Sequence, residues 1–476
     1  MSVNDINITE TIAKVEESLS NDKSISTEFR SLVQLLLIIV KLLVDKIGLN
    51  SRNSSKPPSS DRNRPRVSKS LSKGKKRKPG GQPGHDGSNL EKVKDPDRIE
   101  TIDIDKKSLP RGHYEHVGYD VRQVIDIVVS KQVTEYRAEV VVNSKGKEYT
   151  AEFPKGVTRP IQYGRDLKAQ AVYMSQQQLI PYDRIQDYFS DQCGISISTG
   201  SFCNFNKEAY DLLSKFEEIT RKRLIKEELL NNDETGINVN GKLLWLHCAS
   251  SEFWTMYFPH EKRGTIAIKA MGILESFKGI SCHDHWKPYF NFSCEHALCN
   301  AHHLRELERA WEQDGQKWAK KMQKLLIEID VAVEKAGGSL TKKGAKRFLK
   351  RYRTILALGA NECPPPGPKD TKPKRGRTKK SKARNLLDRL RDFETEVLRF
   401  MTDKRVPFTN NRGENDIRMT KVQQKISGCF RSIDGAKIFC RIRGYLSTCR
   451  KHGIQPTEAL KTLFSGSLPK FAHHTA

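Results

Sequence analysis

The stretch ELLNNDETGINVNGKLLWLHCASSEFWTMYF, residues 228–258, decides the fold. It predicts three β-strands, at 228–236, 242–249 and 252–258, because each run is rich in apolar or aromatic residues and the turn NVNG separates the first two. Helical spacing follows over residues 262–277, and then GISCHDHW predicts a short fourth strand that ends at Asp284. Acidic residues therefore stand at the ends of two of the four strands.

Three antiparallel strands, a helix and a fourth strand with an acid at its end follow one another in the order of an RNase H-like fold. That order places Asp233, on the first strand, beside Asp284, after the fourth. Two neighbouring carboxylates repel each other in a dry site, so their proximity indicates a bound cation. Mg²⁺ prefers oxygen ligands, and a pair of such ions can serve an in-line displacement at phosphate. Glu414 is the candidate for a third carboxylate.

The residues beside these acids leave two alternatives open. Glu234 directly follows Asp233, but successive side chains of a strand point to opposite faces, so only one of the two can face the site. His283 and His285 flank Asp284, and they would suit a transition metal only with a third convergent ligand.

The chain is strongly basic. Its 476 residues include 84 Lys and Arg against 57 Asp and Glu, a formal net charge of +27. Such an excess indicates a polyanionic partner, of which nucleic acid is the commonest. Ten Cys without a CxxC pair, and no secretory signal, predict a cytoplasmic, nucleoid-associated protein. The longest apolar stretch, residues 32–44, is too short to span a membrane, and we expect no membrane partner.

Four segments precede the strands. Residues 1–49 predict a helical segment with an apolar seam that suits either a coiled coil between subunits or packing inside its own domain. Residues 50–97 form a Pro/Gly/Ser-rich basic arm, which we expect to be disordered and to follow a phosphate backbone. Residues 98–158 predict a small β module. Residues 159–226 predict helices, arranged as an ordinary hairpin or as a helix-turn-helix, with Ser198 or Thr199 as an N-cap.

The remaining chain predicts an α/β core with a mixed five-stranded sheet. Residues 227–304 form its first part. Residues 305–408 predict a helical insertion that contains a basic loop at 364–384, and helical patterns lie at 316–336 and 382–400. Residues 409–476 predict the helix that carries Glu414 and a C-terminal helical region.

Five motifs carry a family resemblance. They are NSSKPPSSD (53–61), KPGGQPGHDG (78–87), NNDETG (231–236), CNAHHLREL (299–307) and TNNRGENDIRM (409–419). In this combination and order the chain resembles the bacterial transposases of the insertion sequence 66 family. The resemblance implies a DDE transposase with an RNase H-like catalytic domain. Such an enzyme uses two Mg²⁺ ions, with Mn²⁺ tolerated, to cleave DNA and transfer strands at the ends of its own mobile element.

Carried over position by position, the resemblance places the catalytic, metal-binding carboxylates on Asp233, Asp284 and Glu414. The family's C-x-x-H motif falls on Cys299 and His302, for which we expect a structural or DNA-positioning role near the site in preference to metal binding. Family members often carry paired CxxC motifs before the catalytic domain. Residues 100–155 contain no Cys, so we expect no zinc there.

The helix at 409–425 has two interpretations. Asn411 is a good N-cap, and Glu414 three residues later matches a capping box, which is a purely structural role. Against this, Glu414 shares one helical face with three bases, while Asp416 points away from that face, so Glu414 suits a metal ligand with DNA running past it. The residues expected to bind DNA are Arg418, Lys421, Lys425, Arg305, Lys75, Lys76, Arg77 and Lys78.

The expected partners are double-stranded DNA, at element ends and at the target, and a second copy of the chain in a homo-oligomer. Accessory proteins of the same element are a further expected partner where the element encodes them. Two alternatives stay open for the function. One is a catalytically inactive DNA-binding or regulatory relative, and the other is a nuclease on the same fold, which cuts DNA but never joins it.

Overall fold

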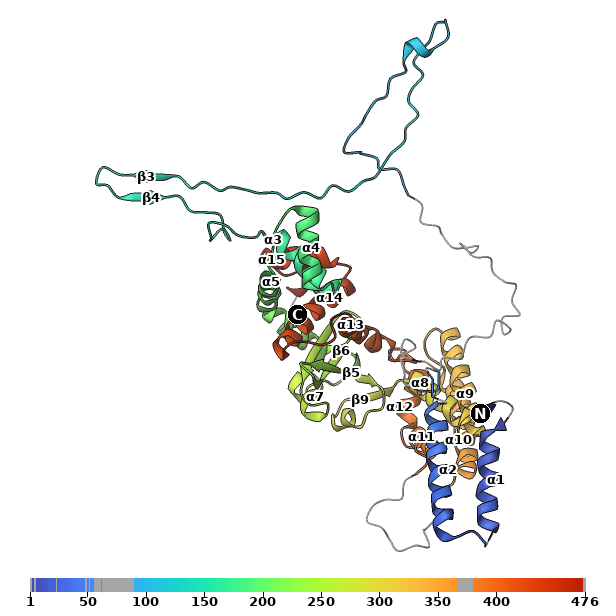
Figure 1. Cartoon of the computed structure of the whole chain (residues 1–476). Helices are drawn as coiled ribbons and strands as arrows, with labels where there is room; N and C mark the ends of the chain where they lie inside the picture. The colour runs from blue at the N-terminus through green and yellow to red at the C-terminus, as the bar shows by residue number, and fades with distance from the viewer. Residues whose placement is uncertain are drawn as a thin grey trace.

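The computed structural model describes residues 2–3, 6–22, 24–47, 49–50, 52–54, 61, 90–365 and 380–473. At its centre lies a five-stranded sheet in the order β7-β6-β5-β8-β9 (Figure 1). Strands β5 (Leu229–Val239), β6 (Lys242–Ser250) and β7 (Thr255–His260) are antiparallel, whereas β8 (Ile280–His283) and β9 (Glu295–Leu298) run parallel to β5. The predicted mixed five-stranded sheet is confirmed.

A two-residue turn sets the register of the first hairpin. Asn240 and Gly241 have φ angles of 48° and 79°, and Val239 pairs with Lys242. Positive φ at both central residues is typical of a type I′ turn, whose twist matches that of the strands it joins. The Asn-Gly pair thereby fixes Asp233 opposite Cys248.

Close approach of two chain segments sets the start of β8. A Cβ atom on Gly279 would lie 2.5 Å from the carbonyl oxygen of Glu228, so only glycine fits where β8 meets β5. From there the parallel register pairs Asn231 with Cys282. Continued two residues along both chains, this register brings Asp233, in the middle of β5, to the level of Asp284, directly after the end of β8.

Helices before and after the sheet, and one between β7 and β8, share one apolar core with it. These are α3 (Arg165–Val172), α4 (Tyr182–Cys193), α5 (Thr199–Leu212), α6 (Ser214–Lys226), α7 (Thr265–Met271), α14 (Ile433–Lys451) and α15 (Pro456–Phe464). Ser198 caps α5, because its side chain accepts a hydrogen bond from the Ser201 backbone N–H. Helix α14 packs on β7, and α13 (Asn411–Ser427) packs on β5 and β6.

The segment between β9 and α13 is helical, and its apolar core around Trp318 and Tyr352 also includes Ile280 and Cys282 of β8 and Ala297 and Leu298 of β9. It contains α8 (Asn300–Glu312), α9 (Lys317–Lys335), α10 (Lys342–Glu362), α11 (Lys382–Asp392) and α12 (Glu394–Leu398). The helices predicted at 316–336 and 382–400 are confirmed, and α10 was not located from the sequence. Residues 366–379, most of the basic loop, lie outside the described residues.

The N-terminal part begins with two short strands, β1 (Ser2–Val3) and β2 (Ile6–Asn7), and two helices, α1 (Ile8–Asn21) and α2 (Thr27–Ile47) (Figure 1). Large apolar side chains of α2 are exposed: Phe29, Leu32, Leu35, Leu36, Ile38, Ile39, Leu42 and Leu43. Among the described residues, no helix has the length and apolar character needed to cross a membrane.

The β module predicted at 98–158 is largely wrong. Over residues 90–163 the structure has one 3-10 helix (Lys106–Ser108) and one short hairpin, β3 (Val140–Val142) with β4 (Glu148–Thr150); the rest is extended chain drawn as two long loops (Figure 1). Val124 and Val128 are 93% and 91% exposed. Strand preference of β-branched residues reflects packing on a half-buried surface, and these side chains have no such surface.

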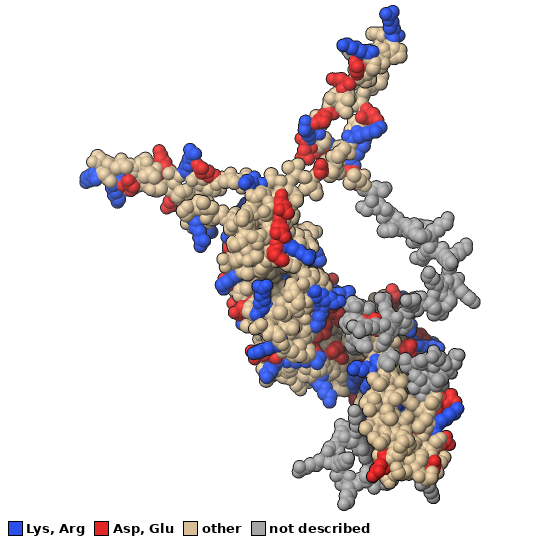
Figure 2. All heavy atoms as spheres, in the orientation of Figure 1, with Lys and Arg blue, Asp and Glu red and all other residues tan. Residues whose placement is uncertain are grey.

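Charge is spread over the molecule. Figure 2 shows Lys and Arg scattered along both extended loops and over the visible face of the folded part, interspersed with acids. The basic excess on this face is thus distributed and forms no single patch.

Candidate active site

Asp233 lies on β5 among other acids. Burial raises the pKa of its carboxyl well above the usual value, and the negative charges of Glu234, Asp284 and Glu414 raise it further. The backbone N–H of Glu234 donates to Asp233 Oδ1 at 2.9 Å, and this hydrogen bond lowers the pKa. The structure therefore brings the three predicted carboxylates close enough to act on one another.

A tight turn after β8 presents Asp284. His285 has a φ of 74°, the left-handed region that non-glycine residues seldom occupy, and the Trp286 backbone N–H donates to Asp284 Oδ1 at 3.1 Å. The carboxylate is thereby held where the strand ends. Backbone strain of this kind is retained where surrounding structure enforces it, and it is concentrated at functional sites.

His283 does not serve a histidine-bearing metal site at Asp284. His283 Nδ1 accepts from the backbone N–H of His285 at 3.2 Å, and its Nε2 lies 3.1 Å from His296 Nδ1. Both ring nitrogens are therefore engaged. Burial lowers the pKa of His283 well below its usual value, so this imidazole is neutral and structural.

Glu234 is held in a buried network. Its carboxylate accepts from Arg263 Nη2 at 2.7 Å and from the Tyr289 hydroxyl at 2.6 Å, and its side chain is 1% exposed. Arg263 in turn lies over the rings of Trp245 and Trp286, at 4.5 and 4.3 Å from their centroids. Glu234 thus anchors β5, while the preceding residue, Asp233, faces the other acids. Sequence reasoning did not identify Arg263 or Tyr289.

The start of α13 differs from the prediction. The N-cap residue is Asn410, one residue before the predicted Asn411, and no side-chain capping bond is made. Asn410 is buried and its side chain bonds to β5: it accepts from Asn231 Nδ2 at 2.7 Å and donates to the Asn232 carbonyl at 2.8 Å. The capping role for Asn411 is therefore wrong, because Asn410 ties the helix start to the sheet instead.

Gly413 permits this close approach. A Cβ atom there would lie 3.2 Å from the side-chain amide of Asn410 and 3.5 Å from Asn231. Glu414 is the next residue, in the first turn of α13. The N-R-G-E sequence thus places a carboxylate beside β5 at the level of Asp233.

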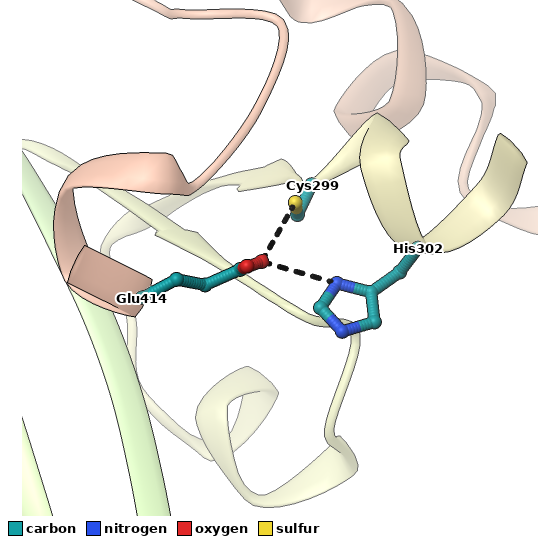
Figure 3. Close-up of side chains that lie close together, drawn as sticks. All are labelled: Cys299, His302 and Glu414. Atoms are coloured by element: carbon teal, nitrogen blue, oxygen red, sulfur yellow. Dashed lines mark hydrogen bonds and ion pairs between the residues drawn. The ribbon is translucent and has the colours of Figure 1, made fainter. Parts of the chain in front are cut away.

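Cys299 and His302 lie directly against Glu414 (Figure 3). The Cys299 thiol donates to Glu414 Oε1 at 3.8 Å, and His302 Nδ1 lies 3.7 Å from the same oxygen. Burial raises the pKa of Cys299 to about 11. Burial lowers the pKa of His302, nearby Arg305 lowers it further, and Glu414 opposes both. Cys299 and His302, for which the sequence predicts a role near the site, thus both lie beside Glu414.

The residues expected to bind DNA have different surroundings. Arg418 is exposed on α13, and Lys421 Nζ donates to the Gly236 carbonyl at 2.6 Å. Lys425 is also exposed, and Arg305 lies beside His302. The cluster Lys75, Lys76, Arg77 and Lys78 lies outside the described residues.

Asp416 faces away from the acids, as its helical position predicts. Its Oδ2 lies 2.9 Å from Lys451 Nζ on α14, and it also accepts from the hydroxyls of Ser250 and Thr255. This carboxylate therefore joins α13 to α14 and to the sheet.

Comparison with known proteins gives two family matches. Residues 2–91 match a family of unknown function (DUF6444). No curated protein matches the chain. The transposase IS66 family matches residues 160–438, a segment that includes the whole sheet and the start of α13. This segment is more than half of the chain, and the protein belongs to the IS66 transposase family.

Proposed function

We propose that this transposase is a DDE enzyme that cleaves DNA and transfers strands at the ends of its insertion sequence. The observation that carries the proposal is the grouping of Asp233, in the middle of β5, with Asp284 and Glu414. The strand order, three antiparallel strands followed by two parallel ones, supports an RNase H-like catalytic domain.

The three acids fit divalent cations. The charged groups that most affect Asp233 are all acids, so ionisation of this carboxyl is costly until a cation arrives. Carboxylate oxygens are the ligands that Mg²⁺ prefers, and Mn²⁺ accepts them as well. When bound, two such ions would polarise the scissile phosphate and stabilise the attacking and leaving oxygens. Asp233, Asp284 and Glu414 would hold them.

The surrounding residues orient this site and meet the DNA. Glu234, bound by Arg263 and Tyr289, fixes the β5 backbone that carries Asp233. Arg418 and Lys425 extend along α13 from Glu414, where a phosphate backbone leaving the site would pass. The basic arm and Arg305 would add contacts that are independent of DNA sequence and sensitive to salt.

The test is an assay on a labelled duplex of the element end, with Mg²⁺ and with a chelator. We expect Mg²⁺-dependent cuts that leave 3′-hydroxyl ends, and products in which those ends are joined to a target duplex. Cuts without joining would identify the nuclease alternative. Salt-sensitive binding without cuts in Mg²⁺ or Mn²⁺ would identify a catalytically inactive relative.

We further propose that the enzyme is a homo-oligomer assembled through α2. Burying a leucine side chain contributes about 2 kcal/mol, so the exposed apolar side chains of α2 favour a helix from a second copy. Light scattering is expected to give a multiple of the chain mass, and Leu36→Lys to lower it toward one chain. Gln34→Lys adds the same charge at an exposed polar position and should leave the mass unchanged. A monomeric wild-type protein, or an unaltered mass in Leu36→Lys, contradicts the proposal.

A further inference from the structure

We propose that Cys299, His302 and Glu414 bind a thiophilic divalent cation of the Zn²⁺ class, and that this ion inhibits transposition by withdrawing Glu414 from the Mg²⁺ site. The ligand atoms of these three residues all lie within 4.8 Å of one another. Within the part of the chain that the structure describes, no other group of three Cys, His or acidic residues is this compact. Figure 3 shows the three side chains converging from α8 and α13.

The spacing of the ligand atoms matches a tetrahedral ion. Zinc bonds of roughly 2.0–2.3 Å at the tetrahedral angle place sulfur and oxygen ligands about 3.6 Å apart, and nitrogen and oxygen ligands about 3.4 Å apart. In the structure Cys299 Sγ lies 3.8 Å from Glu414 Oε1, and His302 Nδ1 lies 3.7 Å from it. Both distances are slightly longer than those that an ion would impose, and all three ligand atoms lie within 4.8 Å of one another.

The site is built before any ion arrives. Cys299 is 1% exposed, it precedes α8 directly, and its Sγ accepts a hydrogen bond from the Asn410 backbone N–H at 3.1 Å. Such a bond stabilises a metal-bound thiolate. His302 lies three residues later on the same helical face, and its Nδ1 is buried without a hydrogen-bond partner. A buried ring nitrogen without a hydrogen-bond partner is unfavourable, and a metal ion would satisfy it.

The set of donors decides the class of ion. One sulfur, one imidazole nitrogen and one carboxylate oxygen suit Zn²⁺, Co²⁺ and Cd²⁺, whereas Mg²⁺ prefers oxygen ligands alone. Three protein ligands leave the fourth tetrahedral position to water. The ion would therefore bind one of the three proposed catalytic carboxylates, Glu414, and would not bind Asp233 or Asp284.

Glu414 is the shared residue, and this part of the inference rests on the proposed function. Glu414 Oε1, the atom beside both Cys299 Sγ and His302 Nδ1, would be bound to Zn²⁺ and would no longer be available to ions held by Asp233 and Asp284. The charge of Asp284 also acts on His302, so the two sites lie side by side. Binding of a thiophilic ion would thus lower activity through competition for one ligand.

Co²⁺ titration of the full chain tests the binding site. We expect a sulfur-to-cobalt charge-transfer band in the near ultraviolet, with four-coordinate visible bands, both removed by added Zn²⁺. Cys299→Ser should abolish the charge-transfer band, and His302→Ala should weaken cobalt binding by tenfold or more. Cys203→Ser removes an exposed thiol elsewhere and should change neither. A wild-type protein without the band, or a band that persists in Cys299→Ser, overturns the site.

Inhibition is tested separately, in the strand-transfer assay with Mg²⁺ held constant. Zn²⁺ should inhibit the wild-type enzyme, and Cys299→Ser should need at least tenfold more Zn²⁺ for the same inhibition. Equal inhibition of the two proteins would overturn the competition. If the wild-type enzyme shows no Mg²⁺-dependent activity, the proposed function fails and the competition with it. The cobalt spectrum still decides the binding site in that case.

Discussion

Asp233→Asn, Asp284→Asn and Glu414→Gln are each expected to reduce DNA cleavage and strand transfer by about 10³-fold or more. Each change removes one charged ligand of the proposed ions. Their charge stabilisation is worth several kcal/mol, and a loss of 1.36 kcal/mol is tenfold in rate. Initial rates on an element-end duplex in Mg²⁺ give the measurement. DNA binding at low salt should be nearly unchanged, because we assign most phosphate contacts to Lys and Arg side chains and not to these acids.

Thermal unfolding separates lost chemistry from lost folding. Asp233 has a raised pKa in the folded state, so its contribution to stability falls as pH rises above the unfolded value of about 3.9. At neutral pH this carboxylate therefore destabilises the metal-free protein. Asp233→Asn should raise the melting temperature without metal and abolish the further rise that Mg²⁺ gives to the wild-type protein.

Glu275→Gln is the matched control, because Glu275 is an exposed carboxylate between α7 and β8 that pairs with exposed Lys269. Its activity and its response to Mg²⁺ should equal those of the wild-type enzyme. Any of the three site variants that is folded and fully active would lose its place in the proposed site. Full activity in all three would remove the DDE mechanism itself.

The parts of the fold that could be predicted from the sequence depend on local chemistry. The Asn240–Gly241 turn fixes a hairpin by itself, since few other residues adopt two successive positive φ angles. The apolar runs on either side then specify strands, and chain order places Asp233 near Asp284. For Glu414, the bases that follow on its helical face gave a reason to prefer it over Asp416, and the structure turns Asp416 away.

The parts that could not be predicted depend on contacts between distant residues. Asn410 and Asn411 are equivalent as caps in sequence, and only the buried bonds from Asn410 to β5 distinguish them. Strand β9 could not be recognised from its Cys- and His-rich sequence, because its strand form depends on pairing with β8. The Val-rich residues 121–129 had the opposite outcome. They have strand composition but no surface to cover, so they remain extended without pairing.

Asp416→Asn and Lys451→Met are the second set of changes with a large expected effect. They are expected to lower the stability of the fold, whereas Glu414→Gln is expected to remove catalysis. Asp416 and Lys451 are each 16% exposed, and Lys451 Nζ also donates to Ser250 Oγ at 2.7 Å and to the Ser251 carbonyl at 2.9 Å. Lys451→Met leaves the Asp416 charge without its cation, which is expected to cost about 3 kcal/mol of unfolding free energy. Urea unfolding at neutral pH gives this value.

The double variant carries the argument further. Removing both charges should restore part of the stability that either single change loses, so a double-mutant cycle should give a coupling free energy of about 2 kcal/mol. At low temperature, where the variants remain folded, Asp416→Asn should keep strand transfer within about tenfold of the wild-type rate, since this carboxylate touches no catalytic group. Glu414→Gln should behave in the opposite way, with unchanged urea unfolding and almost no activity. If Asp416→Asn unfolds like the wild-type protein but loses activity, the catalytic carboxylate of α13 is Asp416, and the site proposed here would have to be rebuilt around it.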